Sequence, residues 1–244
     1  MNTSHILRES LADFGIDFSQ DHIRILEKYL NLVYEYNQKF NLIGTKDKKG
    51  ILIRHVLDSI SILKYEKMVF NNGDHTGKVL DLGTGAGLPG ALLSIFLKDK
   101  IFYLLDKTLK KINFLNMMVE ELGFKNVRVI RGRAEELGNE APYRETFDVV
   151  LARAVAGLNI LSELTIPFCR INGKIIFYKS KKIFTELESN REVISKLGGK
   201  VDNLLEVEVP YLNEYRTFLV IKKVLKSPVI YPRTYNKIVK RPLR

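Results

Sequence analysis

Residues 79–90 read VLDLGTGAGLPG, a short apolar run that ends at four glycines. An apolar pattern resumes after Pro89, at Leu92, Leu93, Ile95 and Phe96. This order indicates a strand, a tight turn and the first turns of a helix. Because glycine lets the backbone approach a ligand closely and a helix start exposes unpaired amides, the stretch predicts a nucleotide-binding turn.

Two cofactors fit these glycines. Residues 85–90 match the G-x-G-x-x-G pattern of dinucleotide sites, and residues 83–87 match the G-x-G-x-G turn of S-adenosylmethionine (SAM) enzymes. The carboxylate of Asp81, two residues before the first glycine, would repel a pyrophosphate and attract the ammonium and sulfonium groups of SAM. Asp106, at the end of the next apolar run, is expected to accept the ribose hydroxyls of either cofactor. The motif therefore favours SAM over NAD, and a turn without a ligand is the third reading.

The composition indicates a globular protein with an anionic partner. The 244 residues, 45% of them hydrophobic, suffice for one full-sized core and an appendage. The formal net charge of +11 favours a polyanionic partner such as nucleic acid. A single cysteine, Cys169, excludes an internal disulfide and suits a reducing compartment. No apolar run has the length of a signal peptide core or a membrane span, so we expect a cytoplasmic protein with no membrane partner.

Residues 1–76 show helical periodicity and predict a helical cap before the nucleotide-binding domain. The polar segment 41–50 is predicted to be a loop over the site, and residues 71–77 form a linker by composition. The apolar positions that define two helices are Ile23, Leu26, Leu30 and Val33, then Ile53, Val56, Leu57, Ile60 and Leu63.

Arg54, His55 and Asp58 follow at helical spacing within this cap. Taken alone, they are expected to form local pairs on a helix surface, with both Arg54 and His55 bound to Asp58.

Residues 77–225 alternate between strand and helix, as a parallel sheet covered on both faces requires. Residues 210–214 are too short for a helical crossover, so the last two strands are predicted to form an antiparallel hairpin. A mostly parallel, seven-stranded sheet with this ending is typical of the Rossmann-like α/β fold of SAM-dependent methyltransferases, and it strengthens the case for SAM. Strands are expected from residue 78 and at 101–105, 127–131, 147–151, 174–178, 201–209 and 216–224, with helices at 109–122, 157–168 and 183–197.

Residues 131–136 follow the third strand, at the edge where ligands of open α/β sheets bind. Ala134 is expected to offer adenine a backbone contact, and Glu135 to accept a hydrogen bond from its amino group. The acids of this turn also suit an ordinary helix start, and the two interpretations are compatible.

The segments that follow the fourth and fifth strands contain cations but no evident base or nucleophile. They are residues 152–157 and 179–182. The Asn/Asp-Pro-Pro-Tyr/Phe tetrapeptide of enzymes that methylate adenine amino groups does not occur there. Cys169, expected mid-helix in the core, has no second cysteine for chemistry at cytosine C5. Guanine N7 has an in-plane lone pair and no proton to lose, so it needs alignment without a base. The lack of an evident base or nucleophile therefore fits guanine N7 as the methyl acceptor.

Six motifs, at residues 41–42, 54–59, 81–90, 132–136, 152–156 and 231–233, together resemble the RsmG (GidB) family. Members of that family methylate N7 of one guanine in the decoding region of bacterial 16S rRNA. The resemblance runs from about residue 20 to the C-terminus. Two positions depart from the usual pattern: Ile43 stands where Thr is common, and Ser180 follows Lys179 where Gly is common.

The resemblance implies SAM as cofactor and 16S rRNA or the small ribosomal subunit as partner. We expect Arg153 and Lys179 to be the catalytic residues. The resemblance also implies that Arg54, His55, Asp58 and Lys179 contact rRNA or order the site. The SAM contacts that it implies are Gly83, Leu88, Asp106, Ala134, Glu135 and Arg153, and the glycine motif itself adds Asp81 and Gly85 to the expected cofactor-binding residues.

Two other functions remain open from the residues. One is an RNA-binding protein that keeps a SAM fold without turnover, and the other is a methyltransferase acting on a different RNA or on protein. The acids at Asp81 and Asp106 argue against a dead site, since RNA binding alone would not require them. We expect a monomer without a metal site.

Residues 226–244 are predicted to be a basic arm. Residues 222–244 hold eight cations and no acid. Three prolines are expected to keep this stretch from forming a helix, while Tyr231 and Tyr235 supply rings that could stack on bases. The functional interpretation is an extended arm along rRNA that includes Arg233 and Lys240, and the alternative is a frayed tail that aids solubility.

Overall fold

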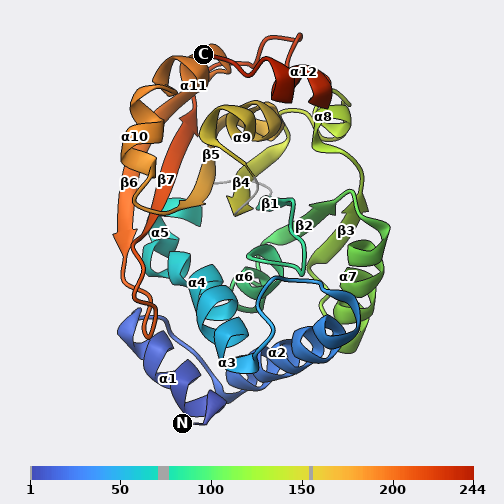
Figure 1. The fold of residues 1–244 in the computed structure, drawn as a ribbon, viewed down its shortest axis with the longest axis vertical. Coiled ribbons are helices and arrows are strands. Elements are labelled where there is room, and N and C mark those ends of the chain that lie inside the picture. The colour runs from blue at the N-terminus through green and yellow to red at the C-terminus, as the bar shows by residue number, and fades with distance from the viewer. Residues whose placement is uncertain (1, 71–76, 154–155) are drawn as a thin grey trace.

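The computed structural model describes residues 2–70, 77–153 and 156–244, arranged around one seven-stranded sheet (Figure 1). Its strand order is β3-β2-β1-β4-β5-β7-β6. Strands β1 to β5 are parallel, and β7 runs antiparallel between β5 and β6, so the predicted fold class is confirmed. The strands are β1 (Lys78–Leu82), β2 (Ile101–Asp106), β3 (Val127–Arg131), β4 (Phe147–Arg153), β5 (Cys169–Lys179), β6 (Gly199–Val207) and β7 (Arg216–Lys223).

The strand order reverses between β1 and β4. The chain steps outward from β1 to β2 and β3, then returns to add β4 and β5 on the other side of β1. Helices that follow β1 and β4 therefore leave on opposite faces and open a crevice at the carboxyl ends of these strands. Ligands of open α/β sheets bind at such a point.

Alternate side chains of the strands enter two separate cores. Val79 belongs to the core on one face and Leu80 to the core on the other. The first core lies under α6 (Gly90–Phe96), α7 (Leu109–Glu121) and the N-terminal helices, and the second under α9 (Leu158–Thr165), α10 (Ile183–Glu188) and α11 (Arg191–Lys196). The described part of the N-terminal region thus packs directly on the sheet (Figure 1).

The N-terminal region is helical, as predicted, and every apolar position that defined its two helices is buried. Its second half is irregular rather than one helix, because α-helical, π-helical and 3-10 turns alternate there. The elements are α1 (Thr3–Asp13), α2 (Gln20–Phe40), α3 (Lys48–Ile51), the π turn η1 (Leu52–Leu57), α4 (Asp58–Ile60), the 3-10 turn η2 (Ser61–Tyr65) and α5 (Glu66–Phe70). The predicted linker, apart from Gly77, lies outside the described residues, as do Ala154 and Val155 of the predicted motif at 152–156.

Two predictions in the second half of the chain are wrong. Cys169 is not mid-helix but begins β5, because Pro167 in the preceding 3-10 turn η3 (Ile166–Phe168) cannot continue an α-helix. The thiol is still buried, and burial raises its pKa to about 12. The helix predicted at 183–197 is two helices, since the Asn190 side chain donates to the Glu186 carbonyl oxygen at 2.6 Å and ends the first.

The C-terminal stretch is not extended, contrary to the prediction. It contains α12 (Tyr235–Lys240), and Tyr231 and Ile238 are buried against the body of the protein. The prolines flank this short helix rather than preventing it, because two precede it and Pro242 follows it. The Arg144 guanidinium donates to the carbonyl oxygens of Gly138, Ser227, Pro228 and Tyr231, which ties the stretch to the sheet domain.

Candidate active site

Asp81 braces the glycine turn from inside. Its side chain is fully buried, and Oδ2 accepts hydrogen bonds from Thr84 Oγ1 at 2.6 Å and from the Gly90 amide at 2.8 Å. Within the described residues, Oδ1 has no hydrogen-bond partner. Burial raises the pKa of this carboxyl to about 6, against the opposing effect of those two hydrogen bonds. Asp81 therefore holds the turn in shape and does not itself line the adjoining cavity.

The turn depends on glycine for its backbone. Gly83, Gly85 and Gly87 have φ angles of 73°, 60° and 91°, in the region where side chains are disfavoured. The turn is also held from outside the sheet, because the buried Tyr29 hydroxyl of α2 donates to the Ala86 carbonyl oxygen at 2.9 Å. The N-terminal helices thus support the cofactor turn directly.

Asp106 ends β2 and faces the cavity next to this turn. Its Oδ1 accepts from the Thr108 amide at 2.9 Å, and Oδ2 accepts from the Gly85 amide at 3.2 Å. Lys111, one turn into α7, makes an ion pair with Oδ2 at 3.4 Å. The carboxylate thereby links the first two loops at the carboxyl edge and still faces the cavity.

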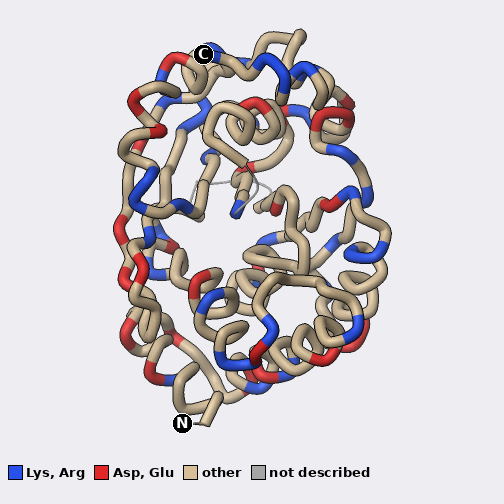
Figure 2. Tube along the Cα trace, viewed as in Figure 1, with Lys and Arg blue, Asp and Glu red and all other residues tan. Residues whose placement is uncertain are grey.

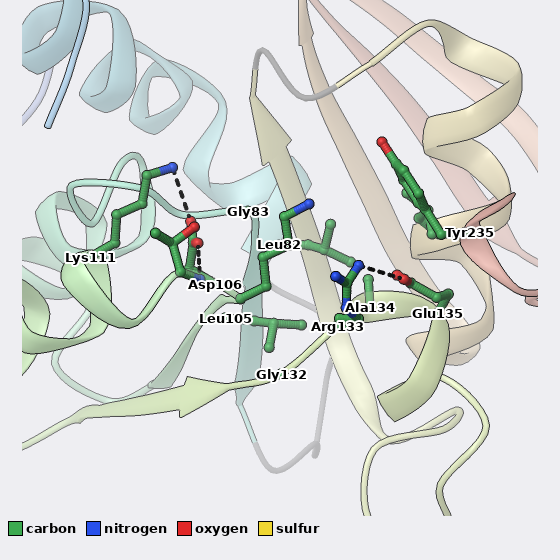
Figure 3. Close-up of a pocket in the computed structure, with 13 residues that line it drawn as sticks. Leu82, Gly83, Leu105, Asp106, Lys111, Gly132, Arg133, Ala134, Glu135 and Tyr235 are labelled. Atoms are coloured by element: carbon green, nitrogen blue, oxygen red, sulfur yellow. Dashed lines mark hydrogen bonds and ion pairs between the residues drawn. The ribbon is translucent and has the colours of Figure 1, made fainter. Parts of the chain in front are cut away.

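The cavity has a volume of about 300 Å³ and lies over the ends of β1, β2 and β3. Figure 3 shows Asp106 and Lys111 at one end and Tyr235 at the other, with Arg133, Ala134 and Glu135 beside it. Helices α9 and α12 supply the far wall. The lining residues are Leu82, Gly83, Leu105, Asp106, Lys107, Thr108, Lys111, Gly132, Arg133, Ala134, Glu135, Leu164 and Tyr235.

This set of residues fits SAM. Asp106 is a carboxylate acceptor of the kind that binds ribose hydroxyls, and Leu82, Leu105 and Leu164 supply apolar walls for a base. The buried carboxylate of Asp81, with one oxygen unpaired among the described residues, provides negative charge behind the turn, which suits a cationic cofactor.

A charged cluster occupies the same edge of the sheet, at the carboxyl end of β4 and the amino end of the antiparallel β7. Asp58 in α4 receives Arg153 of β4 on Oδ2 and Arg216 of β7 on Oδ1, both at 3.0 Å. Arg216 also pairs with Glu214 at 2.7 Å, and Glu214 pairs with Arg54. The local pairs predicted between Asp58 and its helical neighbours are wrong, because the arginines of distant strands occupy both carboxylate oxygens.

His55 is held neutral in this cluster. Its Nε2 lies 2.8 Å from Thr45 Oγ1, and its Nδ1 lies 3.3 Å from an Arg153 guanidinium nitrogen. Burial, with the charges of Arg153 and Arg54, lowers the pKa of the imidazole to about 4. Since guanidinium can only donate, Nδ1 accepts and Nε2 donates to Thr45. Both ring nitrogens are therefore engaged.

Lys179 lies beside this cluster at the end of β5. Arg153 is opposite Tyr178 in the register of β4 and β5, so Arg153 and Lys179 share one edge of the sheet. The ammonium of Lys179 pairs with Glu186 of α10 at 2.8 Å. The charge of Arg153 also acts on the pKa of Asp81, which connects this cluster electrostatically with the glycine turn.

The other sites predicted from sequence lie in three places. Gly83, Asp106, Ala134 and Glu135 line the cavity, while Gly85 and the buried Leu88 belong to the turn behind it. Arg233 and Lys240 lie on the C-terminal stretch, away from the Asp58 cluster. Arg233 is not a free cation, because it pairs with the buried Glu163 at 2.7 Å, whereas Lys240 is exposed.

Sequence reasoning missed part of the cavity wall. Lys107 and Thr108 directly follow Asp106, and Lys111 lies one helical turn later, so the position of Asp106 could have indicated all three. Leu164 and Tyr235 carry no such signal, because they reach the cavity only through the packing of α9 and α12.

Residues 2–70, 77–153 and 156–244 show neither a metal-binding cluster nor a membrane-spanning helix. In those ranges, no group of three or more His, Cys, Asp or Glu side chains is arranged to hold a metal ion. None of the helices in the same ranges combines the length and apolar character needed to cross a membrane.

The fold and the site define a SAM-dependent methyltransferase. Among solved structures, a SAM-dependent methyltransferase from Aquifex aeolicus matches with a TM-score of 0.51 and 21% identity, over 69% of this chain and 92% of that chain. The 16S rRNA (adenine(1408)-N(1))-methyltransferase from Catenulisporales acidiphilia matches with a TM-score of 0.52 and 12% identity, over 64% and 89%. At these identities the likeness concerns the fold.

The chain belongs to the GidB family, described as rRNA small subunit methyltransferase G, which matches residues 22–214. Ribosomal RNA small subunit methyltransferase G of Thermoanaerobacter pseudethanolicus is 37% identical over 98% of this chain and 97% of its own length. The enzymes of that name from Alkaliphilus oremlandii and Lactococcus lactis are also 37% identical, over 100% and 96% of this chain, and 100% and 97% of their own lengths. The resemblance inferred from the motifs is confirmed, as is the choice of SAM over NAD.

Proposed function

We propose that this protein transfers the methyl group of SAM to N7 of one guanine in 16S rRNA. The observation that carries the proposal is the pairing of a SAM-type cavity with the Asp58 cluster, in which His55 is neutral and engaged at both nitrogens. Such a site presents cations and no free imidazole base. The names of the relatives, all rRNA small subunit methyltransferases, support the same substrate class.

Methylation of guanine N7 requires a positioned base, and cationic side chains can position it. SAM supplies an electrophilic methyl group when bound. Guanine N7 needs no deprotonation, so the protein must align the base and exclude water. We assign this alignment to Arg153 and Lys179, whose donors suit the O6 acceptor of guanine and neighbouring phosphates. Asp58 and Glu186 hold these two side chains in place.

The cofactor is assigned to the cavity and its supporting turn. Asp106 would accept the ribose hydroxyls, and Ala134 and Glu135 would flank the adenine. Gly83 contributes backbone to the cavity wall. Asp81, Gly85 and Leu88 would act from behind, by fixing the turn and its charge.

Cations surround this edge of the sheet and would receive the rRNA backbone. Figure 2 shows Lys and Arg on the segments around the carboxyl ends of the strands. Arg54 is about half exposed, while His55 is partly buried. Exposed lysines come from residues 41–50, from the β2–α7 connection and the start of α7, and from the β5–α10 connection. They are Lys46, Lys48, Lys49, Lys107, Lys110, Lys181 and Lys182.

Transfer of labelled methyl from SAM to 16S rRNA and to small subunits tests the proposal, followed by chemical cleavage selective for N7-methylguanine. We expect label in RNA and cleavage at one position. Label in protein, or in RNA without that cleavage, would assign a different methyltransferase activity. RNA binding without any label would support the RNA-binding protein that lacks turnover.

We also propose that the enzyme acts as a cytoplasmic monomer. One complete cofactor cavity is built from a single chain, which supports this state. Light scattering during size-exclusion chromatography would show a mass near 28.1 kDa. A stable mass of twice that value would overturn it.

A further inference from the structure

The C-terminal stretch, residues 226–244, builds part of the cofactor cavity although the family match ends at residue 214. From its sequence, this stretch is expected to be either an arm along rRNA or a frayed tail. The structure instead packs it over α8 (Ala134–Leu137) and α9, on the side of the cavity opposite Asp106 (Figure 3).

Two anchors hold the chain on either side of Tyr235. Two residues earlier, the Arg233 amide and guanidinium donate to the buried Glu163 carboxylate at 2.7 to 2.9 Å. Three residues later, Ile238 is fully buried. Glu163 directly precedes Leu164, which lines the cavity, so the same turn of α9 anchors the stretch and forms the wall.

A third anchor joins the C-terminal stretch to the loop after β3. The Asn139 side-chain amide donates to the Pro232 carbonyl oxygen at 3.0 Å and to the Glu135 carbonyl oxygen at 2.9 Å. Gly138 makes the close approach possible, since a Cβ there would lie 3.0 Å from the Pro232 ring. The loop after β3 and the C-terminal stretch are therefore held as one unit.

Tyr235 lies at the end of the cavity beside Ala134 and Glu135 (Figure 3). Leu164 also belongs to the cavity lining. Tyr235 is 41% exposed, and the Lys107 ammonium lies 5.4 Å from its ring centroid. Lys107 follows Asp106 directly, so the ring closes the cavity toward the loop that holds the ribose acceptor. An aromatic ring beside apolar walls suits a purine, whereas the carboxylate at the other end suits hydroxyl groups.

We propose that Tyr235 binds the adenine ring of SAM, so that the C-terminal stretch is part of the cofactor site. This inference rests on the proposed function, because it requires SAM in this cavity with its ribose at Asp106. It assigns a contact beyond residues 22–214, the range that the family model matches.

The protein contains no tryptophan, so one can be placed as a reporter. The Tyr235→Trp variant would carry its only indole at the cavity wall, and Tyr211→Trp, at an exposed tyrosine of the β6–β7 hairpin, is the matched control. We expect SAM and its demethylated product to change the emission of the Tyr235→Trp variant alone. Unchanged emission at saturating SAM, or an equal change in both variants, would overturn the inference.

Calorimetry supplies the second measurement. We expect Tyr235→Ala to weaken SAM binding about tenfold and Tyr235→Phe to retain it, because the contact is made by the ring face. Tyr211→Ala should leave it unchanged. Equal affinity for Tyr235→Ala and the wild-type protein overturns the inference while SAM binding itself stands. If the wild-type protein gives no SAM signal, the proposed function fails and this assignment fails with it.

Discussion

Asp81 and Asp58 are both buried aspartates, and they differ in what satisfies them. Asp81 accepts from Thr84 and Gly90, three and nine residues away, and neither donor is charged. Asp58 binds the arginines Arg153 and Arg216, which are 95 and 158 residues away. The Asp81 carboxylate stabilises a local turn, but its negative charge is not paired with a cation among these donors. The Asp58 carboxylate ties the N-terminal helices to two strands and orients the arginine proposed to face the substrate.

Replacing Asp58 should have the largest effect. We expect Asp58→Asn to lower the free energy of unfolding by about 4 kcal/mol, because two largely buried guanidinium groups lose their shared carboxylate. Urea denaturation measures this change. Asp99→Asn is the control, since the Asp99 carboxylate is exposed and pairs with the adjacent Lys100, so its replacement should cost less than about 1 kcal/mol. Wild-type stability in Asp58→Asn would remove the contrast between the two aspartates.

Asp81→Asn should behave in the opposite way. The carboxyl has an ordinary pKa of 3.8 and a folded pKa of about 6, so between these values the folded state binds more protons than the unfolded state. As pH rises from 3.8 to 6, the free energy of unfolding of the wild-type protein should therefore fall relative to that of the variant, by up to about 3 kcal/mol. Weaker hydrogen bonds from Asn in the variant would reduce this difference.

Urea unfolding of both forms at pH 4 and pH 7.5 checks this sign. We expect Asp81→Asn to be at least as stable as the wild-type protein at pH 7.5. A variant that is less stable at pH 7.5 than at pH 4, relative to the wild-type protein, would mean that Asp81 is stabilised as an anion in the same manner as Asp58.

Asp106 is proposed to bind the cofactor, whereas Asp81 and Asp58 stabilise the protein structure. We expect Asp106→Ala to weaken SAM binding by about 2 kcal/mol, because charge-assisted hydrogen bonds to the ribose are lost. Isothermal titration calorimetry measures this change. Asp99→Ala, just before the opposite end of β2, is the control and should bind SAM normally. An unchanged dissociation constant for Asp106→Ala would move the ribose away from the end of β2.

The smallest expected effect is on RNA binding and comes from the cations of the C-terminal stretch, of which one is paired and three are exposed. Arg233 pairs with Glu163, whereas Lys237, Lys240 and Arg241 are exposed. Replacing those three with Gln should make the salt dependence of RNA binding shallower by about 2 in log-log slope, if each meets one phosphate. RNA affinity across a salt series measures the slope.

A matched control for this experiment lies near the amino ends of β2 and β3. Replacing Lys98, Lys125 and Arg128 with Gln removes the same amount of charge from exposed positions. We expect the slope to change less for this variant. Equal slopes for all three proteins would leave the C-terminal cations without a role in RNA binding.

The sequence by itself determined the fold class and half of the cofactor site. The glycine turn, the strand ends at Asp81 and Asp106, and the closing hairpin all follow from patterns within a few residues. They could be predicted because hydrogen bonds of strands, turns and helix starts form between near neighbours, and their requirements show directly as apolar periodicity and glycine.

Only the tertiary structure decided how charges pair and where the C-terminal stretch lies. The partners of Asp58, the neutral state of His55 and the Glu163 carboxylate under Arg233 join segments 70 to 158 residues apart. The same is true of Tyr235, which reaches the cavity because α12 packs on α9. An ion pair depends on two side chains meeting through packing, and the residue type at one position does not specify its distant partner.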